Sequence, residues 1–128
     1  MVLFRSRRLG GVVVDGACRD LDEIREIGLP VYARAVVPVT ARGRVMQHSF
    51  NDEVQCGGVQ VRPGDLVIAD GSGVVFIPQE KEEEVISGAE AIAAREAEMA
   101  SALREGRRVT EVMGSMGYES MLVKGRKG

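Results

Sequence analysis

The stretch GGVVVDGACRDLDEIREIGLPVYARAVV, residues 10–37, decides the fold class. Its β-branched run Gly11–Val14 predicts a strand that is buried on both faces. Apolar residues at helical spacing then predict a short helix over Asp20–Ile27, which Gly28 ends. Residues 29–37 form a second apolar run and predict a second strand. A strand, a helix and a strand in close succession predict a βαβ unit with a right-handed crossover, and therefore an α/β protein.

The middle of the chain is rich in short strand signals. Four further segments predict strands: Val45–Phe50, Gly58–Val61, Leu66–Asp70 and Val74–Pro78. The signal is weakest at Val45–Phe50. The last two are joined by a glycine-rich turn and predict a hairpin. Asp65 and Asp70 are interpreted as turn residues, because aspartate side chains accept hydrogen bonds from nearby backbone amides.

The composition changes after Pro78 to Ala, Glu, Lys and Arg. An apolar stripe at helical spacing predicts a long amphipathic helix that begins at Gln79 and ends at Gly106. A second short helix is predicted at Val109–Met113. Beyond it, three apolar residues predict a small anchor in the tail: Tyr118, Met121 and Leu122.

Length, charge and cysteine usage narrow the class of protein. We expect 128 residues to form one domain over 1–128, with 79–128 as a C-terminal helical extension. The net charge of −2 argues against direct nucleic-acid binding. Two cysteines without a CxxC pattern indicate free thiols in a reducing compartment. The start MVLFRSRRL is too short and too charged for a signal peptide, and no apolar run is long enough to span a membrane, so we expect a cytoplasmic protein.

Arg19, Asp20 and Glu23 allow two interpretations. In the first, Asp20 caps the helix and Glu23 completes a capping box, which would stabilise the helix start by about 1 kcal/mol. The neighbouring Asp22 also fits, because negative charge is favourable at a helix N-terminus. Arg19 is left unexplained, since a cation is unfavourable at that end of a helix.

In the second interpretation, the same residues form a ligand site. Ligands of open α/β sheets bind beyond the carboxyl ends of the strands, which is where Arg19 and Asp20 fall in the sequence. Arginine can bind a carboxylate through two parallel hydrogen bonds, and aspartate supplies the hard oxygen that magnesium prefers. With a divalent cation, the pair would hold a 2-oxo acid and polarise its carbonyl. Spacing alone leaves both interpretations open.

Two blocks of the sequence resemble the RraA-like family. They are GGVVVDGACRDLDEIREIGLPVYAR, residues 10–34, and CGGVQVRPGDLVIADGSGVVFIP, residues 56–78. The tail around Tyr118-Glu119 resembles the longer, aldolase-type members. The family includes 4-hydroxy-4-methyl-2-oxoglutarate aldolases and regulators of ribonuclease activity. The resemblance implies a swivelling α/β/α domain that assembles as a homotrimer or hexamer, with active sites between protomers.

The resemblance also implies roles for individual residues. Arg19 would bind the pyruvyl carboxylate and stabilise negative charge, Asp20 would ligate Mg²⁺ or Mn²⁺, and Glu23 would help hold water at the metal. The family motif has a glycine about twenty residues before the Arg-Asp pair, which would lie before Met1. We therefore expect the chain to be N-terminally incomplete, without the glycine loop and the acid that other members carry there.

Two functions follow as hypotheses. The leading one is a metal-dependent, class II pyruvate aldolase, a lyase that cleaves 4-hydroxy-4-methyl-2-oxoglutarate or a close analogue and decarboxylates oxaloacetate as a side activity. Its partners would be a small 2-oxo acid and further copies of the chain. The alternative is a non-catalytic protein-interaction module that binds and regulates a ribonuclease. Arg19 and Asp20 do not decide between them, because the motif can persist in such modules.

Overall fold

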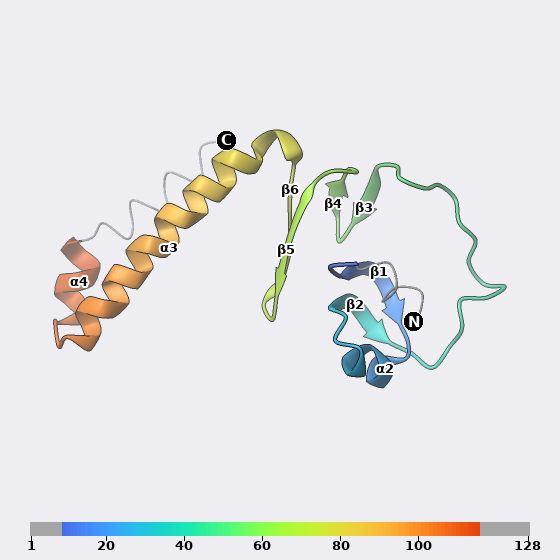
Figure 1. Ribbon diagram of the computed structural model, residues 1–128, viewed down its shortest axis with the longest axis horizontal. Helices are drawn as coiled ribbons and strands as arrows, with labels where there is room; N and C mark the ends of the chain where they lie inside the picture. The colour runs from blue at the N-terminus through green and yellow to red at the C-terminus, as the bar shows by residue number, and fades with distance from the viewer. Residues whose placement is uncertain (1–8, 116–128) are drawn as a thin grey trace. The chain divides into compact units, whose positions relative to one another are not determined.

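The computed structural model describes residues 9–115, which divide into two compact units on either side of the Gln79–Glu80 bond (Figure 1). The predicted anchor of Tyr118, Met121 and Leu122 lies outside the described residues. Within the described part of the chain, no helix is both long enough and apolar enough to cross a membrane.

The first unit begins with the predicted βαβ element. Strand β1 (Val12–Cys18) and strand β2 (Val31–Val36) are parallel, and helix α2 (Leu21–Glu26) connects them. The pairing runs from Val12 opposite Val31 to Cys18 opposite Val36. The parallel βαβ prediction is confirmed, while the hand of the crossover stays a prediction.

Strand β1 departs from the prediction in two ways. It continues beyond Val14 through an irregularity at Asp15 and Gly16, so two residues of β1 lie opposite one residue of β2. Its side chains are half-buried or exposed, so the prediction of a strand buried on both faces is wrong. The sheet has only two strands in the described residues, and a second covering layer is needed to bury both faces.

Helix α2 ends at a left-handed glycine, as predicted. Gly28 has φ of 65°, and its N–H donates to the carbonyl of Arg25 at 3.1 Å. The N–H of Leu29 donates to the carbonyl of Ile24 at 3.3 Å, which completes a Schellman motif. Ile24 and Leu29 are both buried, so this helix end also supplies the small core of the unit.

Two antiparallel hairpins complete the first unit. Strands β3 (Val54–Cys56) and β4 (Val59–Val61) form one, and strands β5 (Leu66–Asp70) and β6 (Gly73–Ile77) form the predicted second one. The predicted strand at Val45–Phe50 is wrong, because this segment is irregular loop. Its apolar side chains stay in water, with Met46 89% and Phe50 87% exposed, and no neighbouring strand pairs with it.

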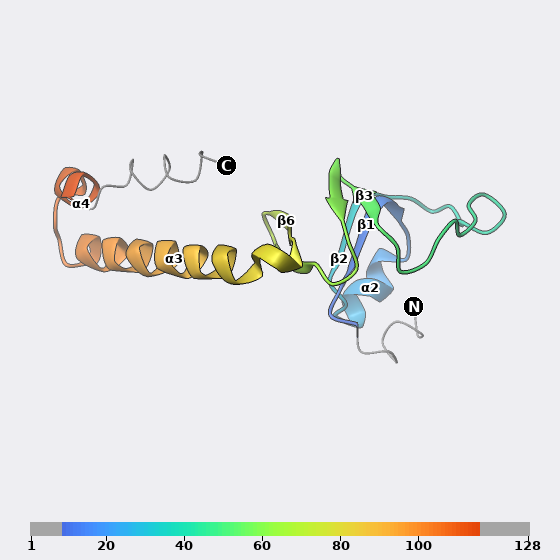
Figure 2. The ribbon, with the colours of Figure 1, turned by 90° about the horizontal axis from the view of Figure 1, so that it is seen from above.

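The second unit is helical. A 3₁₀ turn (Gln79–Lys81) leads into helix α3 (Glu82–Arg104), and helix α4 (Val109–Ser115) lies at the carboxyl end of α3 (Figure 2). Both predicted helices are confirmed. Helix α3 begins at Glu82 rather than at Gln79 and ends at Arg104, just before Gly106, whose φ is 87°. Its buried core consists of Met99, Ala102 and Val112. The rest of the predicted apolar stripe is more exposed, including Val85 and Ile92.

Candidate functional site

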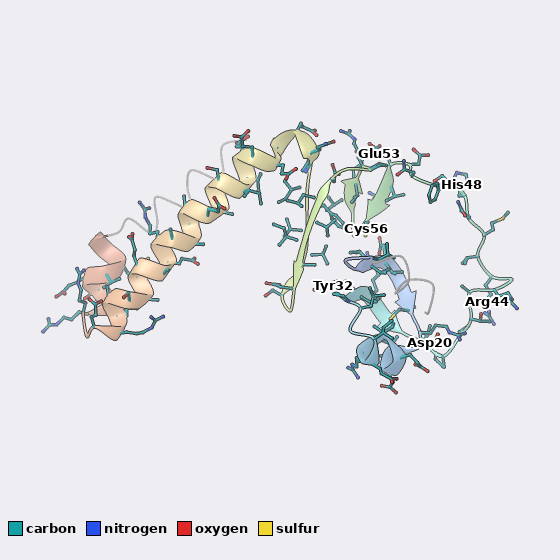
Figure 3. The ribbon with its side chains drawn as sticks, in the orientation of Figure 1. Asp20, Tyr32, Arg44, His48, Glu53 and Cys56 are labelled. Atoms are coloured by element: carbon teal, nitrogen blue, oxygen red, sulfur yellow. The ribbon has the colours of Figure 1, made fainter. Side chains whose placement is uncertain are left out.

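The Arg19-Asp20 pair lies between the end of β1 and the start of α2. The N–H of Val37 donates to the carbonyl of Cys18 at 2.9 Å. The loop that follows β2 therefore begins next to the Arg19-Asp20 pair. Figure 3 shows the Asp20 side chain at this edge of the sheet. The carboxyl ends of two parallel strands therefore meet here, which is the usual position of ligand sites in open α/β sheets.

Asp20 occupies the N-cap position, directly before α2, in an unusual backbone conformation. Its φ and ψ are 63° and 45°, in the left-handed region, and its carbonyl accepts the N–H of Ile24 at 3.0 Å. Its carboxylate caps no helix N–H. The predicted capping box is wrong, because a capping residue normally has extended dihedral angles that direct its side chain back to the helix amides.

The Asp20 carboxylate binds Arg19 instead. The Nε of Arg19 donates to both carboxylate oxygens, at 2.9 and 3.0 Å. The two side chains are 51% and 37% exposed, so the pair adds at most about 1 kcal/mol to stability. A left-handed non-glycine residue costs roughly as much. The arrangement therefore has little value for the fold, and strained, exposed polar groups of this kind are frequent at functional sites.

Two depressions meet at the Arg19-Asp20 pair. One, of about 490 Å³, is also lined by Glu23 in the first turn of α2 and by the segment Val36–Pro38. The other, of about 690 Å³, has apolar walls from β1 and α2 and is also lined by the loop segment Thr40–Arg42. The structure thus brings the three sequence-predicted residues Arg19, Asp20 and Glu23 to the lining of one depression.

The donor set at this edge fits a divalent cation that keeps open positions. Asp20 and Glu23 offer carboxylate oxygens, and no group of three or more His, Cys, Asp or Glu side chains forms a closed metal site among residues 9–115. Magnesium is commonly held by one or two carboxylates, with water and substrate oxygens completing its octahedron. The residues present suit that mode and do not suit a structural metal enclosed by protein.

A second polar cluster was missed by the sequence analysis. The Asp15 carboxylate accepts hydrogen bonds from the Nε of Arg34 and, at 2.8 Å, from the backbone N–H of Gly57. The Arg34 guanidinium, and then the Gly57 amide, hold the pKa of Asp15 below its ordinary value. The signal in the sequence was Asp15, an acid directly after the predicted strand Gly11–Val14; the strand continues through it to Cys18.

The cluster ties three segments together. Asp15 lies at the irregularity of β1, Arg34 lies in β2, and Gly57 lies in the turn between β3 and β4. Cys56 and Tyr32 line a depression of about 540 Å³ beside it and are labelled in Figure 3. The cluster therefore holds the β3–β4 hairpin against the parallel strands, close to the bulge that leads to Arg19.

The other polar residues have the structural roles that were expected. The Asp70 carboxylate accepts the N–H of Ser72 at 2.7 Å, and this bond holds the pKa of Asp70 below its usual value. The Asp65 carboxylate accepts the N–H groups of Arg62, at 2.8 Å, and Gln79, at 3.2 Å. Both aspartates are confirmed as turn residues. His48 is exposed on the long loop after β2.

The family model for RraA-like proteins, described as Aldolase/RraA, matches residues 1–76. The chain belongs to the RraA-like family. The match covers both site segments, Arg19–Glu23 and the Asp15 cluster. The family assignment and the α/β fold class, with its long C-terminal helix, are therefore confirmed.

Relatives in the RraA-like family carry aldolase names. A protein of Halalkalibacterium halodurans named putative 4-hydroxy-4-methyl-2-oxoglutarate aldolase is 38% identical over 69% of this chain and 42% of its own length. An uncharacterized protein of Methanocaldococcus jannaschii is 34% identical over 80% of this chain and 49% of its own length. The chain thus spans about half the length, or less, of the curated relatives it matches.

Two solved structures share the fold. An uncharacterized protein from Pseudomonas syringae superimposes with a TM-score of 0.84 and 26% identity, over 89% of this chain and 54% of that one. Streptomyces coelicolor RraAS2, described as an unusual member of the RNase ES inhibitor RraA family, has a TM-score of 0.64 and 31% identity, over 80% of this chain and 52% of that one.

Proposed function

We propose that this chain carries the Arg-Asp half of a metal-dependent pyruvate lyase site. The reaction would cleave 4-hydroxy-4-methyl-2-oxoglutarate or a close analogue, with decarboxylation of oxaloacetate as a side activity. The observation that carries the proposal is the exposed Arg19-Asp20 pair, held by a left-handed Asp20 at the carboxyl edge of the sheet. The relatives named as putative 4-hydroxy-4-methyl-2-oxoglutarate aldolases support it.

Each residue has a distinct task in this proposal. A bound Mg²⁺ or Mn²⁺ supplies a Lewis acid that polarises the 2-oxo group. Asp20 holds the ion. Arg19 contacts Asp20 through Nε, and its two terminal nitrogens make no hydrogen bond to any residue in the range 9–115, so they can bind the substrate carboxylate. Glu23 holds a water molecule that accepts the substrate hydroxyl proton.

The C3–C4 bond breaks in both substrates. In the aldol cleavage, the C3–C4 bond breaks, the C4 hydroxyl loses its proton, and the electron pair moves onto C3 and the C2 oxygen. In oxaloacetate, C4 leaves as carbon dioxide, and no hydroxyl proton has to be removed. Protonation at C3 gives pyruvate in both reactions. Arg19 stabilises the negative charge that develops at the C2 oxygen.

Oxaloacetate is the sharper substrate for a test, because its decarboxylation needs no general base. Pyruvate would be followed through lactate dehydrogenase with Mg²⁺ or chelator, after subtraction of the metal's own background rate. Asp20→Asn is the matched variant, since asparagine tolerates the left-handed conformation while it removes the charged ligand. We expect turnover to fall about 100-fold or more in Asp20→Asn and in Arg19→Ala.

Glu26→Gln provides the control for this experiment. Glu26 is an exposed acid on the same helix and lines neither depression. Its variant should retain full turnover. Metal-dependent turnover that is unchanged in Asp20→Asn and Arg19→Ala would sink the proposal, and so would a well-folded wild-type protein without turnover.

A second candidate function is a non-catalytic module that binds a ribonuclease. It is favoured by the likeness to Streptomyces coelicolor RraAS2, which is described within a family of RNase ES inhibitors. The test is capture of ribonuclease by the tagged chain from source-cell lysate, followed by mass spectrometry and a ribonuclease assay with purified components. Capture without any RNA-processing protein, or capture without an effect on ribonuclease rate, would count against this function.

A further inference from the structure

The loop after β2 carries two arginines, Arg42 and Arg44, that have no acidic partner among residues 9–115. Residues 9–79 contain six arginines, and four of them form ion pairs with carboxylates: Arg19 with Asp20, Arg25 with Asp22, Arg34 with Asp15 and Arg62 with Glu53. The side chains of Arg42 and Arg44 form no ion pair or hydrogen bond with a residue of the described chain. Two guanidinium groups are thus available to an anion.

Only Arg42 of these two lines the 690 Å³ depression that Arg19 and Asp20 border. A local turn fixes its backbone: the N–H of Arg42 donates to Thr40 Oγ1 at 3.2 Å, and the N–H of Arg44 donates to the Ala41 carbonyl at 3.0 Å. The loop itself starts where Val37 pairs with Cys18, next to Arg19. Arg42 therefore lies in this turn and lines the depression together with Arg19 and Asp20.

The charges of the depression suit a ligand with two negative groups. Arg19 and Arg42 contribute two positive charges and Asp20 one negative charge, and a divalent cation on Asp20 would add two more positive charges. The remaining wall is apolar, formed by β1 and β2 with Ile24 and Leu29. Such a pocket fits a short carbon chain with a carboxylate at each end, because a guanidinium binds a carboxylate through parallel hydrogen bonds. Arg42 has no competing acid among residues 9–115, and Arg19 contacts Asp20 through Nε alone.

We propose that Arg42 binds the distal carboxylate of a 2-oxo dicarboxylate, while Arg19 binds the carboxylate next to the 2-oxo group. The inference rests on the proposed lyase function and names its substrate class. When the C3–C4 bond breaks, the distal carboxylate leaves with the departing carbon, so pyruvate has no group for Arg42. Arg42 therefore makes the site prefer the substrate over the product. In 4-hydroxy-4-methyl-2-oxoglutarate the carboxylate that Arg42 binds is C5, which is not part of the C3–C4 bond that breaks.

The first test measures binding and needs no turnover. Calorimetry in the presence of Mg²⁺ would compare 2-oxoglutarate with 2-oxopentanoate, in which a methyl group replaces the distal carboxylate. We expect the wild-type chain to bind 2-oxoglutarate about tenfold more tightly, the strength of one charge-assisted contact. Arg42→Gln should abolish this preference, Arg42→Lys should keep part of it, and the control Arg44→Gln should keep all of it.

The second test is kinetic. For 4-hydroxy-4-methyl-2-oxoglutarate, whose distal carboxylate lies outside the bond that breaks, Arg42→Gln should raise KM about tenfold with little change in kcat, and inhibition by pyruvate should stay as in wild type. A preference for 2-oxoglutarate that survives in Arg42→Gln overturns the assignment even when turnover is normal. A third outcome is that Arg42→Gln loses the preference while the wild-type chain shows no turnover. That outcome would support Arg42 as a dicarboxylate ligand and refute the proposed lyase function. A wild-type chain that binds neither acid overturns both proposals.

Discussion

Asp15 couples the first unit to pH. The Arg34 guanidinium and the Gly57 amide stabilise its carboxylate form and hold its pKa below the ordinary value of 3.8. A group whose pKa is lowered by folding stabilises the fold above its ordinary pKa, and that stabilisation is lost as the pH falls through the folded value. We expect Asp15→Asn to lower the urea midpoint above about pH 5 and the gap from wild type to close in more acidic solution.

The control for Asp15 is Asp22→Asn. Asp22 has a side chain that is 97% exposed, and its variant removes the same charge without disturbing the cluster. The amide proton of Gly57 gives a second measurement, because its NMR shift should report protonation of Asp15 in wild type alone. A gap between wild type and Asp15→Asn that stays constant from pH 7 to pH 2 would refute this account.

Single residues were predictable where a chemical type and a spacing were enough. Arg19 and Asp20 were found in this way, and Glu23 was added by the resemblance to the RraA-like family. All three line one depression, while their roles stay proposals. The capping box was wrong, because the left-handed dihedral angles of Asp20 decide where its carboxylate goes, and an Asp-x-x-Glu pattern carries no information about them. Arg42 could not be found, since its position depends on a loop whose fold no periodicity predicts.

Gly28 tests the sequence signal that ended α2. Its φ of 65° is strained for a residue with a Cβ atom, although no atom lies within 4 Å of the position that the Cβ would take. Gly28→Ala should therefore destabilise the first unit by about 1 kcal/mol through the backbone alone. Thermal or urea unfolding would measure the loss.

Gly71→Ala is the matched control for that prediction. Gly71 also has open space around its Cβ position, but its φ lies outside the left-handed range. It should have a much smaller effect on the unfolding midpoint. Equal losses in the two variants would show that the left-handed conformation of Gly28 is not the source of the cost.

Elements were predictable where a local pattern sufficed. Helix α2 and its glycine end, helix α3 and the β5–β6 hairpin follow from periodicity and turn residues, which act over a few neighbours. The segment Val45–Phe50 has similar strand-forming residues but no partner strand in the described chain. Strand propensity mostly reflects packing against neighbours, so the sequence of one segment cannot show whether those neighbours exist.

The extent of the folded domain is a question for the whole molecule. The expectation of one domain over 1–128 stays a prediction. The boundary between the two compact units, at Gln79 and Glu80, coincides with the predicted start of the helical extension at residue 79.

The first unit exposes much apolar strand surface. In the β5–β6 hairpin, the cross-strand pair Ile68 and Val75 is 47% and 58% exposed. Apolar surface of this kind favours association.

Self-association is the prediction that follows at this scale. We expect light scattering to give a mass three or six times the chain mass of 13.8 kDa, as the RraA-like relationship proposes. If a neighbouring copy covers the Ile68-Val75 pair, Ile68→Lys should shift the mass toward a single chain, because burial of an unpaired ammonium is costly. Ser72→Lys adds the same charge at the exposed tip of the hairpin and should leave the mass unchanged. A single-chain mass for wild type at high concentration would refute assembly, and an oligomer unaffected by Ile68→Lys would place its interface on another surface.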